Sequence, residues 1–148
     1  MSSRRSRRAR RVLIGVVMFV LGIQAIPYGH NHTDPPVRTE PTWDSRQTQE
    51  LAARACYDCH SNKTVWPWYA NIAPVSWLTQ RDVNDGRKVL NFSEGDRSQK
   101  GAQKLVRAVR KGEMPPWYYA AFNPQGTLSS AEHQALIRGL EATSPGQQ

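Results

Sequence analysis

The first 28 residues of the chain differ sharply from those that follow. Six arginines lie between Arg4 and Arg11, and no acidic residue accompanies them. The stretch from Val12 to Ile26 then contains a single polar side chain, Gln24. A basic cluster followed by an apolar stretch is typical of a segment that directs a chain to a membrane and leaves its basic end in the cytoplasm. A folded domain can therefore be built only from the remaining 120 residues.

We expect residues 12–28 to form a transmembrane signal anchor after a cytoplasmic basic N-terminus at residues 1–11. As a helix, these 17 residues would be about 25 Å long, slightly less than the roughly 30 Å of bilayer hydrocarbon. A cleaved signal peptide is the alternative, but Ile23-Gln24-Ala25 makes a weak cleavage site. Ser6-Arg7-Arg8 resembles a twin-arginine signal. Because a run this rich in arginine contains such a pair by chance, we favour general secretion. With or without cleavage, everything after Tyr28 is exported. With the anchor retained, we expect an inner-membrane location with the domain facing the periplasm.

The net charge of +8 does not describe the expected domain. Outside the arginine cluster the chain has 14 basic and 12 acidic side chains, a surplus of only +2. A nucleic-acid-binding domain needs a basic surface, so we exclude nucleic acid as a partner.

Residues 29–43 contain three prolines, which predicts an extended linker. We expect a single domain at residues 44–142 and a tail at residues 143–148. A domain this small gains stability from a cofactor in its core.

The apolar residues of the domain repeat with helical spacing, and no sustained period-two alternation is present. This pattern predicts an all-α fold with long ordered loops at residues 61–75 and 112–128. Four helices are expected, the third of them ending at Gly112. They begin near Asp44 with Gln47, near Ser76, at Ser93 with Asp96, and at Ser129 with Glu132; the last pair is a capping box.

The two cysteines of the chain, Cys56 and Cys59, are separated by two residues and followed by His60. This spacing is the attachment sequence of a c-type haem, in which both sulfurs add to one porphyrin and the histidine binds the iron from below. A redox pair would need a thioredoxin-like context, and a zinc site would need two more ligands. A disulfide between these cysteines would close a strained loop. We therefore predict one covalently attached haem c, with His60 as a metal ligand.

The sixth position of the iron needs a second ligand or stays open. Met114 follows Gly112 and precedes two prolines, which fix an extended backbone, so we predict it as the other axial ligand. A methionine that merely fills the core is the alternative. The other histidines are weaker candidates, because His133 lies on a helix, and His30 and His32 lie in the linker.

Aromatic residues are concentrated after the attachment sequence and after Met114. We expect the first group to cover the cofactor and exclude water from it. An ordinary aromatic core is the alternative, and the two do not exclude each other. That group is Trp66, Trp68, Tyr69 and Trp77. Trp117, Tyr118 and Tyr119 are expected to close the other side. Three basic residues, Arg54, Lys63 and Arg87, could neutralise haem propionates or guide a partner, and solvated surface charge is the alternative for each.

Several motifs occur together in an order that resembles the small bacterial haem-binding domain family. They are Cys56-Tyr57-Asp58-Cys59-His60-Ser61-Asn62, Trp66-Pro67-Trp68-Tyr69, Pro74-Val75-Ser76-Trp77-Leu78, Leu90-Asn91-Phe92-Ser93 and Glu113-Met114-Pro115-Pro116. The resemblance extends from about Ile26 to Leu140. It implies a small cytochrome c-like domain around one covalent haem, His60 as proximal ligand and an extracytoplasmic location. Asn123-Pro124 stands where the family commonly has His-Pro, which leaves Met114 with less competition for the iron.

These observations predict a membrane-anchored monohaem c-type cytochrome that passes single electrons to an unidentified redox partner protein. We do not expect an enzyme, because two axial ligands leave no open position on the iron for a substrate. The alternative is a haem enzyme of peroxidase type, or a haem-based gas or redox sensor, in which the sixth ligand is labile or absent.

Overall fold

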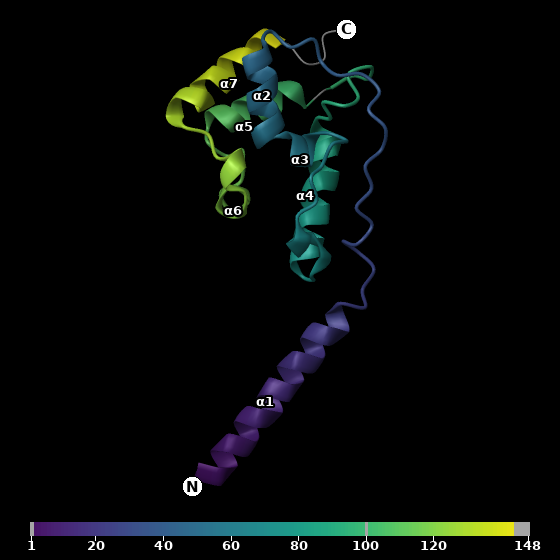
Figure 1. The fold of residues 1–148 in the computed structure, drawn as a ribbon, viewed down its shortest axis with the longest axis vertical. Helices are drawn as coiled ribbons and strands as arrows, with labels where there is room; N and C mark the ends of the chain where they lie inside the picture. The colour runs from purple at the N-terminus through teal and green to yellow at the C-terminus, as the bar shows by residue number, and fades with distance from the viewer. Residues whose placement is uncertain (1, 100, 144–148) are drawn as a thin grey trace. The chain divides into compact units, whose positions relative to one another are not determined.

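A computed structural model describes residues 2–99 and 101–143 of the chain (Figure 1). Within these residues it contains seven α-helices, two short 3-10 turns and no strand, so the all-α prediction is confirmed. The helices are α1 Ser2–Ile23, α2 Arg46–Ala55, α3 Tyr57–His60, α4 Val75–Val89, α5 Ala102–Arg110, α6 Trp117–Phe122 and α7 Ser130–Thr143. The 3-10 turns are Trp68–Asn71 and Pro124–Gly126. Residues 144–148 of the expected tail lie outside the described residues.

The chain divides into two compact units. The first unit consists of Met1–His32 and Pro67–Arg81, and the second unit of Thr33–Trp66 and Asp82–Gln148. The boundary falls inside α4, whose first half belongs to the first unit and whose second half belongs to the second.

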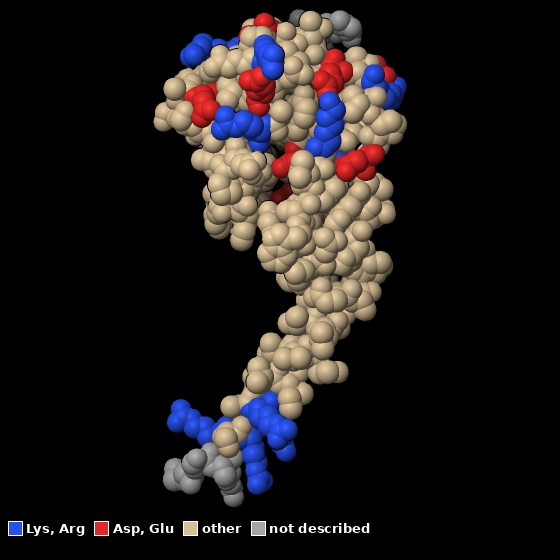
Figure 2. All heavy atoms as spheres, in the orientation of Figure 1, with Lys and Arg blue, Asp and Glu red and all other residues tan. Residues whose placement is uncertain are grey.

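The long helix of the first unit is α1, which joins the arginines and the apolar stretch in one element. Figure 2 shows the basic side chains gathered at its N-terminal end. From Val12 to the end of the helix at Ile23, the apolar part measures only about 18 Å. Within the described part of the chain, no helix combines the length and the apolar character needed to cross a bilayer. The transmembrane helix expected over residues 12–28 is therefore not found, because α1 ends early and shares its length with arginines.

The core of the second unit is formed by α2, α5 and α7, with α7 in contact with both other helices (Figure 1). The side chains at their centre are buried, among them Leu51, Leu105, Val109, Leu136 and Leu140. A close approach of α7 to α2 explains Gly139, where an added Cβ would lie 1.9 Å from the Thr48 hydroxyl oxygen. The expected apolar faces thus meet in one core.

Two of the helix starts differ from the prediction. Ser45, and not Asp44, caps α2, because its hydroxyl accepts a hydrogen bond from the amide of Thr48 at 3.2 Å. Ser93 begins no helix, since its hydroxyl accepts instead from the amide of Asn62 at 2.9 Å, and α5 starts only at Ala102. The rest of the pattern holds: α5 buries Leu105 and Val109, and Gly112 follows it with φ +71°.

The capping box of α7 is confirmed. Ser129 donates its amide to a Glu132 carboxylate oxygen at 2.8 Å, and the Glu132 amide donates to the Ser129 hydroxyl at 3.3 Å. Both segments expected as long loops contain short helical turns, and residues 112–128 include all of α6. The aromatic run from Trp117 gave no apolar periodicity by which this helix could be recognised.

Candidate functional site

A cavity of about 320 Å³ lies in the second unit. It is bounded by α3, the second half of α4, α5 and the segment from Met114 to Tyr119. Its wall is mostly apolar, and its volume falls in the usual range of small-molecule sites. The two expected attachment residues, Cys56 and Cys59, and the two expected axial ligands, His60 and Met114, all line it. The structure therefore brings together residues that are up to 58 positions apart in the sequence.

The cysteine pair lies at the junction of α2 and α3. The amides of Cys59 and His60 donate to the Cys56 carbonyl at 3.1 and 2.8 Å, which forms a single helical turn whose two cysteines line the cavity. Both cysteines are free thiols. Burial, together with the neighbouring Cys59, raises the pKa of Cys56 to about 12. Burial, with Asp82 and Asp58, raises the pKa of Cys59 to about 12.

These thiols do not resemble those of a redox or zinc site. Reactive redox cysteines have a lowered pKa in an electropositive setting, whereas here the pKa of both thiols is raised. A structural zinc site needs four ligands, and no group of three or more His, Cys, Asp or Glu residues suited to a metal ion is present among the described residues. The pair is arranged instead as two protonated thiols at an apolar wall.

His60 is buried beside the pair, with 6% of its surface exposed. Its Nδ1 lies 3.2 Å from the Leu90 carbonyl oxygen, which can only accept, so in the neutral ring Nδ1 carries the proton and Nε2 has the lone pair. Burial lowers the pKa of His60, which favours the neutral imidazole. A histidine that donates a hydrogen bond through one ring nitrogen and carries no proton on the other is the usual form of a metal ligand.

Gly86 lets α4 approach this turn closely. An added Cβ there would lie 2.3 Å from the Cys59 carbonyl oxygen, so no other residue fits without moving the backbone. From the sequence, Gly86 is only a weak point in a helix. The structure shows a continuous α4 in which this residue supports the attachment turn.

Behind His60, buried polar side chains hold the chain from Leu90 to Ser93 in place. The Phe92 amide donates to the His60 carbonyl at 2.7 Å. Asn91 donates to the Asn62 side-chain oxygen at 2.8 Å, and its own side-chain oxygen accepts from the Ser93 amide at 3.0 Å. These groups are almost completely buried, and each satisfied bond avoids the cost of an unpaired polar group.

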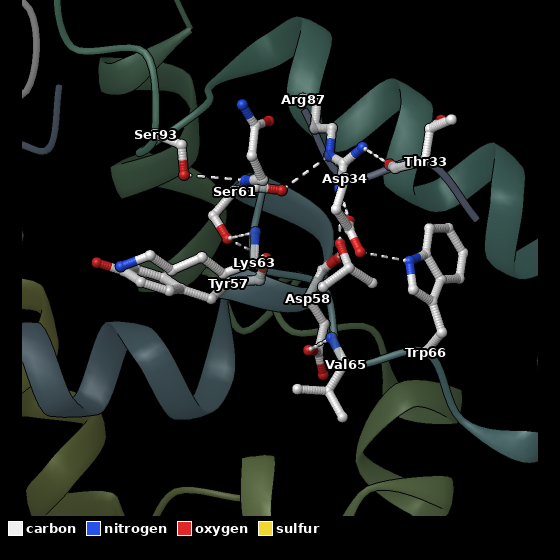
Figure 3. Close-up of polar contacts among 12 residues, drawn as sticks. Thr33, Asp34, Tyr57, Asp58, Ser61, Lys63, Val65, Trp66, Arg87 and Ser93 are labelled. Carbon is white, nitrogen blue, oxygen red and sulfur yellow. Dashed lines mark hydrogen bonds and ion pairs between the residues drawn. The ribbon is translucent and has the colours of Figure 1, made fainter. Parts of the chain in front are cut away.

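Arg87 forms a second set of bonds around the same turn, shown in Figure 3. Its guanidinium donates to the carbonyls of Ser61 at 2.8 Å and Thr33 at 2.6 Å. It also binds the Thr64 hydroxyl at 2.9 Å and the Asp34 carboxylate at 2.6 Å. The expected linker is thus fastened to the second unit from Thr33 onward, a contact that no local sequence pattern indicates.

The three basic residues considered for propionates are engaged elsewhere, and none lines the cavity. Arg54 binds Glu132 at 2.7 Å, and Lys63 binds Glu40. Lys104, which lies in no sequence motif, is the lysine among the lining residues, with Asp82 and Asp85 as the acidic ones. Its exposed position on α5, next to buried Leu105, gave no distinguishing signal.

Met114 enters the cavity from the segment between α5 and α6. It is half-buried, packs against the core and lines the cavity together with Pro115 and Pro116. Of the aromatic residues next to it, Tyr118 and Tyr119 line the cavity, as expected, whereas Trp117 is 82% exposed and does not.

The earlier aromatic group is divided between the units. Trp66 belongs to the second unit but does not line the cavity, and its indole nitrogen donates to Asp34 at 3.0 Å (Figure 3). Trp68, Tyr69 and Trp77 belong to the first unit. Trp68 packs edge-on against Tyr69 with ring centroids 5.8 Å apart.

The structure describes an all-α domain in which two thiols, an imidazole and a thioether line one mostly apolar cavity. The sequence matches the haem-binding domain family over residues 18–142, and the chain belongs to that family. No curated protein and no solved structure gives a significant match.

The residues present fit a haem. Two free thiols one helical turn apart, beside a neutral histidine, supply the donor set of covalent attachment. The apolar wall suits a porphyrin, and Met114 lines the same cavity as His60. Cys56 and Cys59 would hold the haem covalently, while His60 and Met114 are the residues available to its iron.

Proposed function

We propose that the protein is a monohaem c-type cytochrome that carries single electrons outside the cytoplasm. The observation that supports this most directly is the meeting of Cys56, Cys59, His60 and Met114 at one apolar cavity. A bound haem would supply an iron that can accept and release one electron. The residues of the chain would fix its orientation and exclude water, and an apolar setting raises the reduction potential.

A carrier is favoured over an enzyme because the chain offers two axial ligands. His60 is held in the tautomer that binds a metal, and Met114 offers a soft thioether of the kind that cytochromes c use. With both positions filled, no position on the iron would be open to a substrate, which leaves electron transfer as the use of the bound group. The alternative, a haem enzyme or sensor with an open or labile sixth position, is an outcome of the experiment below.

The N-terminal segment supports the proposed location. Arginines followed by an apolar stretch form an export signal, and thioether attachment takes place outside the cytoplasm in bacteria. We therefore place the second unit on the extracytoplasmic side, where an unidentified redox protein would be its partner. Fractionation of cells that express the full chain should place the haem stain with the periplasm or the inner membrane. Haem-stained protein confined to the cytoplasm would contradict this location.

The absorption spectrum of purified protein tests the proposal. The pyridine haemochrome should have the c-type signature, and it should disappear when Cys56 and Cys59 are both replaced by alanine. The oxidised protein should show a methionine-to-iron charge-transfer band. Met114→Leu, which keeps the volume but removes the thioether, should abolish that band. Met18→Leu, on α1, is the matched control and should retain it.

Two results would overturn the proposal in different ways. A haemochrome without the c-type signature would contradict covalent attachment. A high-spin spectrum of the native protein that shifts with peroxide or carbon monoxide would instead favour the enzyme or sensor.

A further inference from the structure

The helix α6 poses a question of packing. It follows Met114 closely, yet it buries none of its six residues. Trp117 and Phe122 at its two ends are 82% and 68% exposed. A helix this short is unstable by itself and needs tertiary contacts to form. The contacts that hold it therefore decide where the Met114 segment lies.

One contact comes from Tyr119. Its hydroxyl donates to a carboxylate oxygen of Asp58 at 2.8 Å, and the Asn123 side chain bridges the two, 2.6 Å from the hydroxyl and 3.3 Å from the carboxylate. The other Asp58 oxygen accepts from the Val65 amide at 3.0 Å, which fixes the carboxylate (Figure 3). Asp58 lies between the two cysteines, so α6 is fastened to the attachment turn itself.

The second contact comes from Tyr118. Its hydroxyl donates to a carboxylate oxygen of Asp82 on α4 at 2.9 Å. Asp82 lies one helical turn before Gly86, the residue that contacts the attachment turn. Both tyrosines and Asp82 line the cavity. Hydrogen bonds to a carboxylate are stronger than those between neutral groups, and more so where water is scarce.

The chain between these contacts and Met114 is short and stiff. Only Pro115 and Pro116 lie between Met114 and the first residue of α6, and proline fixes the backbone angle φ. The Pro116 carbonyl accepts from the amides of Tyr119 and Ala120 at 3.0 and 3.2 Å, which joins the proline pair to the helix. A displacement of α6 would therefore be transmitted to Met114.

We propose that Tyr118 and Tyr119 are positioning residues, whose hydroxyl bonds to Asp82 and Asp58 hold α6 and keep the Met114 thioether in the cavity that His60 lines. The proposal rests on the proposed function for the identity of the sixth ligand. It adds the device that keeps this ligand in place. The covalent attachment and the imidazole are independent of it.

The test uses full-length holo-protein carrying Tyr118→Phe, Tyr119→Phe or both, which removes the hydroxyls and keeps the rings. Covalent haem content should match that of the native protein. In the reduced double variant, carbon monoxide should replace the sixth ligand about tenfold more readily, because each lost bond to a carboxylate favours the open form. The charge-transfer band should weaken more in the double variant than in either single variant. Tyr57→Phe is the matched control: it is buried but does not line the cavity, and it should bind carbon monoxide like the native protein.

Hydrogen exchange separates this proposal from the assignment of Met114. Amides of residues 117–123 should exchange faster in the double variant, while those of α2 and α7 stay unchanged. If the native protein lacks the charge-transfer band, the sixth ligand is wrong, and faster exchange still supports the tyrosine contacts. If exchange and carbon monoxide binding are unchanged in the double variant, the positioning role is overturned. An equal effect of Tyr57→Phe would likewise overturn it.

Discussion

The His60 side of the cavity and the Met114 side are held in different ways. His60 lies in a buried region where its ring nitrogen, its carbonyl and the following residues are all hydrogen-bonded. Met114 lies beside a short helix that buries nothing and depends on two tyrosine hydroxyls. The His60 side is therefore fixed by the folded chain, whereas the Met114 side can open at the cost of a few hydrogen bonds.

The largest difference should appear when a buried aromatic residue is removed from the His60 side. Phe92 is 1% exposed, and its ring packs against Tyr57 and Trp43 with centroids 5.7 and 5.2 Å apart. Phe92→Ala should lower the free energy of unfolding by about 3–5 kcal/mol, because it leaves a cavity in a packed core. Urea unfolding of the holo-protein measures this. A loss below about 1 kcal/mol would show that this side is not rigidly packed.

Arg87 offers the next largest effect. Its side chain is 13% exposed and donates to four oxygens, which a lysine cannot reach together. Arg87→Lys should cost about 1.5–3 kcal/mol of unfolding free energy, since the buried Ser61 carbonyl and Thr64 hydroxyl are left unpaired. Arg46→Lys, at an ion pair where the arginine is 90% exposed, is the matched control and should change little. Equal effects of the two variants would argue against the Arg87 contacts.

Acid should weaken the contact between the start of α7 and Arg54 of α2 through Glu132. Hydrogen bonds from Ser129 and the ion pair with Arg54 lower the pKa of Glu132 from 4.5 to about 2. Because the folded pKa is the lower one, the stabilisation is present above pH 4.5 and is lost as the pH falls toward about 2. The thermal midpoint of the native protein should therefore fall over this range, and that of Glu132→Gln should fall less. Parallel curves for the two proteins would contradict this origin.

The smallest effect is expected for the most exposed aromatic side chain of α6. Trp117 is 82% exposed, so Trp117→Ala should change the free energy of unfolding by less than about 0.5 kcal/mol. The same urea experiment as for Phe92→Ala gives a direct comparison of the two sides. A loss as large as that of Phe92→Ala would remove the distinction between them.

The parts of the site that the sequence predicted are those encoded locally. The attachment sequence places Cys56, Cys59 and His60 within one turn, and the proline pair marks Met114 as a presented residue. The helices with a clear apolar face were likewise found, as was the capping box at Ser129.

The parts that the sequence did not predict depend on partners far away in the chain. Ser93 has the pattern of a helix cap, but a tertiary bond to the Asn62 amide takes its hydroxyl. Tyr119 and Asp58 are 61 residues apart, and only the fold makes them neighbours. The close approach at Gly86 is equally non-local, because the contacted oxygen belongs to Cys59.

The fastening of the segment after Thr33 has a practical consequence for fragment design. Asp34 binds Arg87 and Trp66, the Pro36 carbonyl accepts from Asn62 at 3.1 Å, and the Arg38 amide donates to Ser93 at 2.9 Å. A fragment that starts at Asp44, where the helical pattern begins, would strip these partners from the wall behind the histidine. An expression boundary at or before Thr33 keeps them, and with the same export signal on both fragments it should give the higher yield of haem-loaded protein.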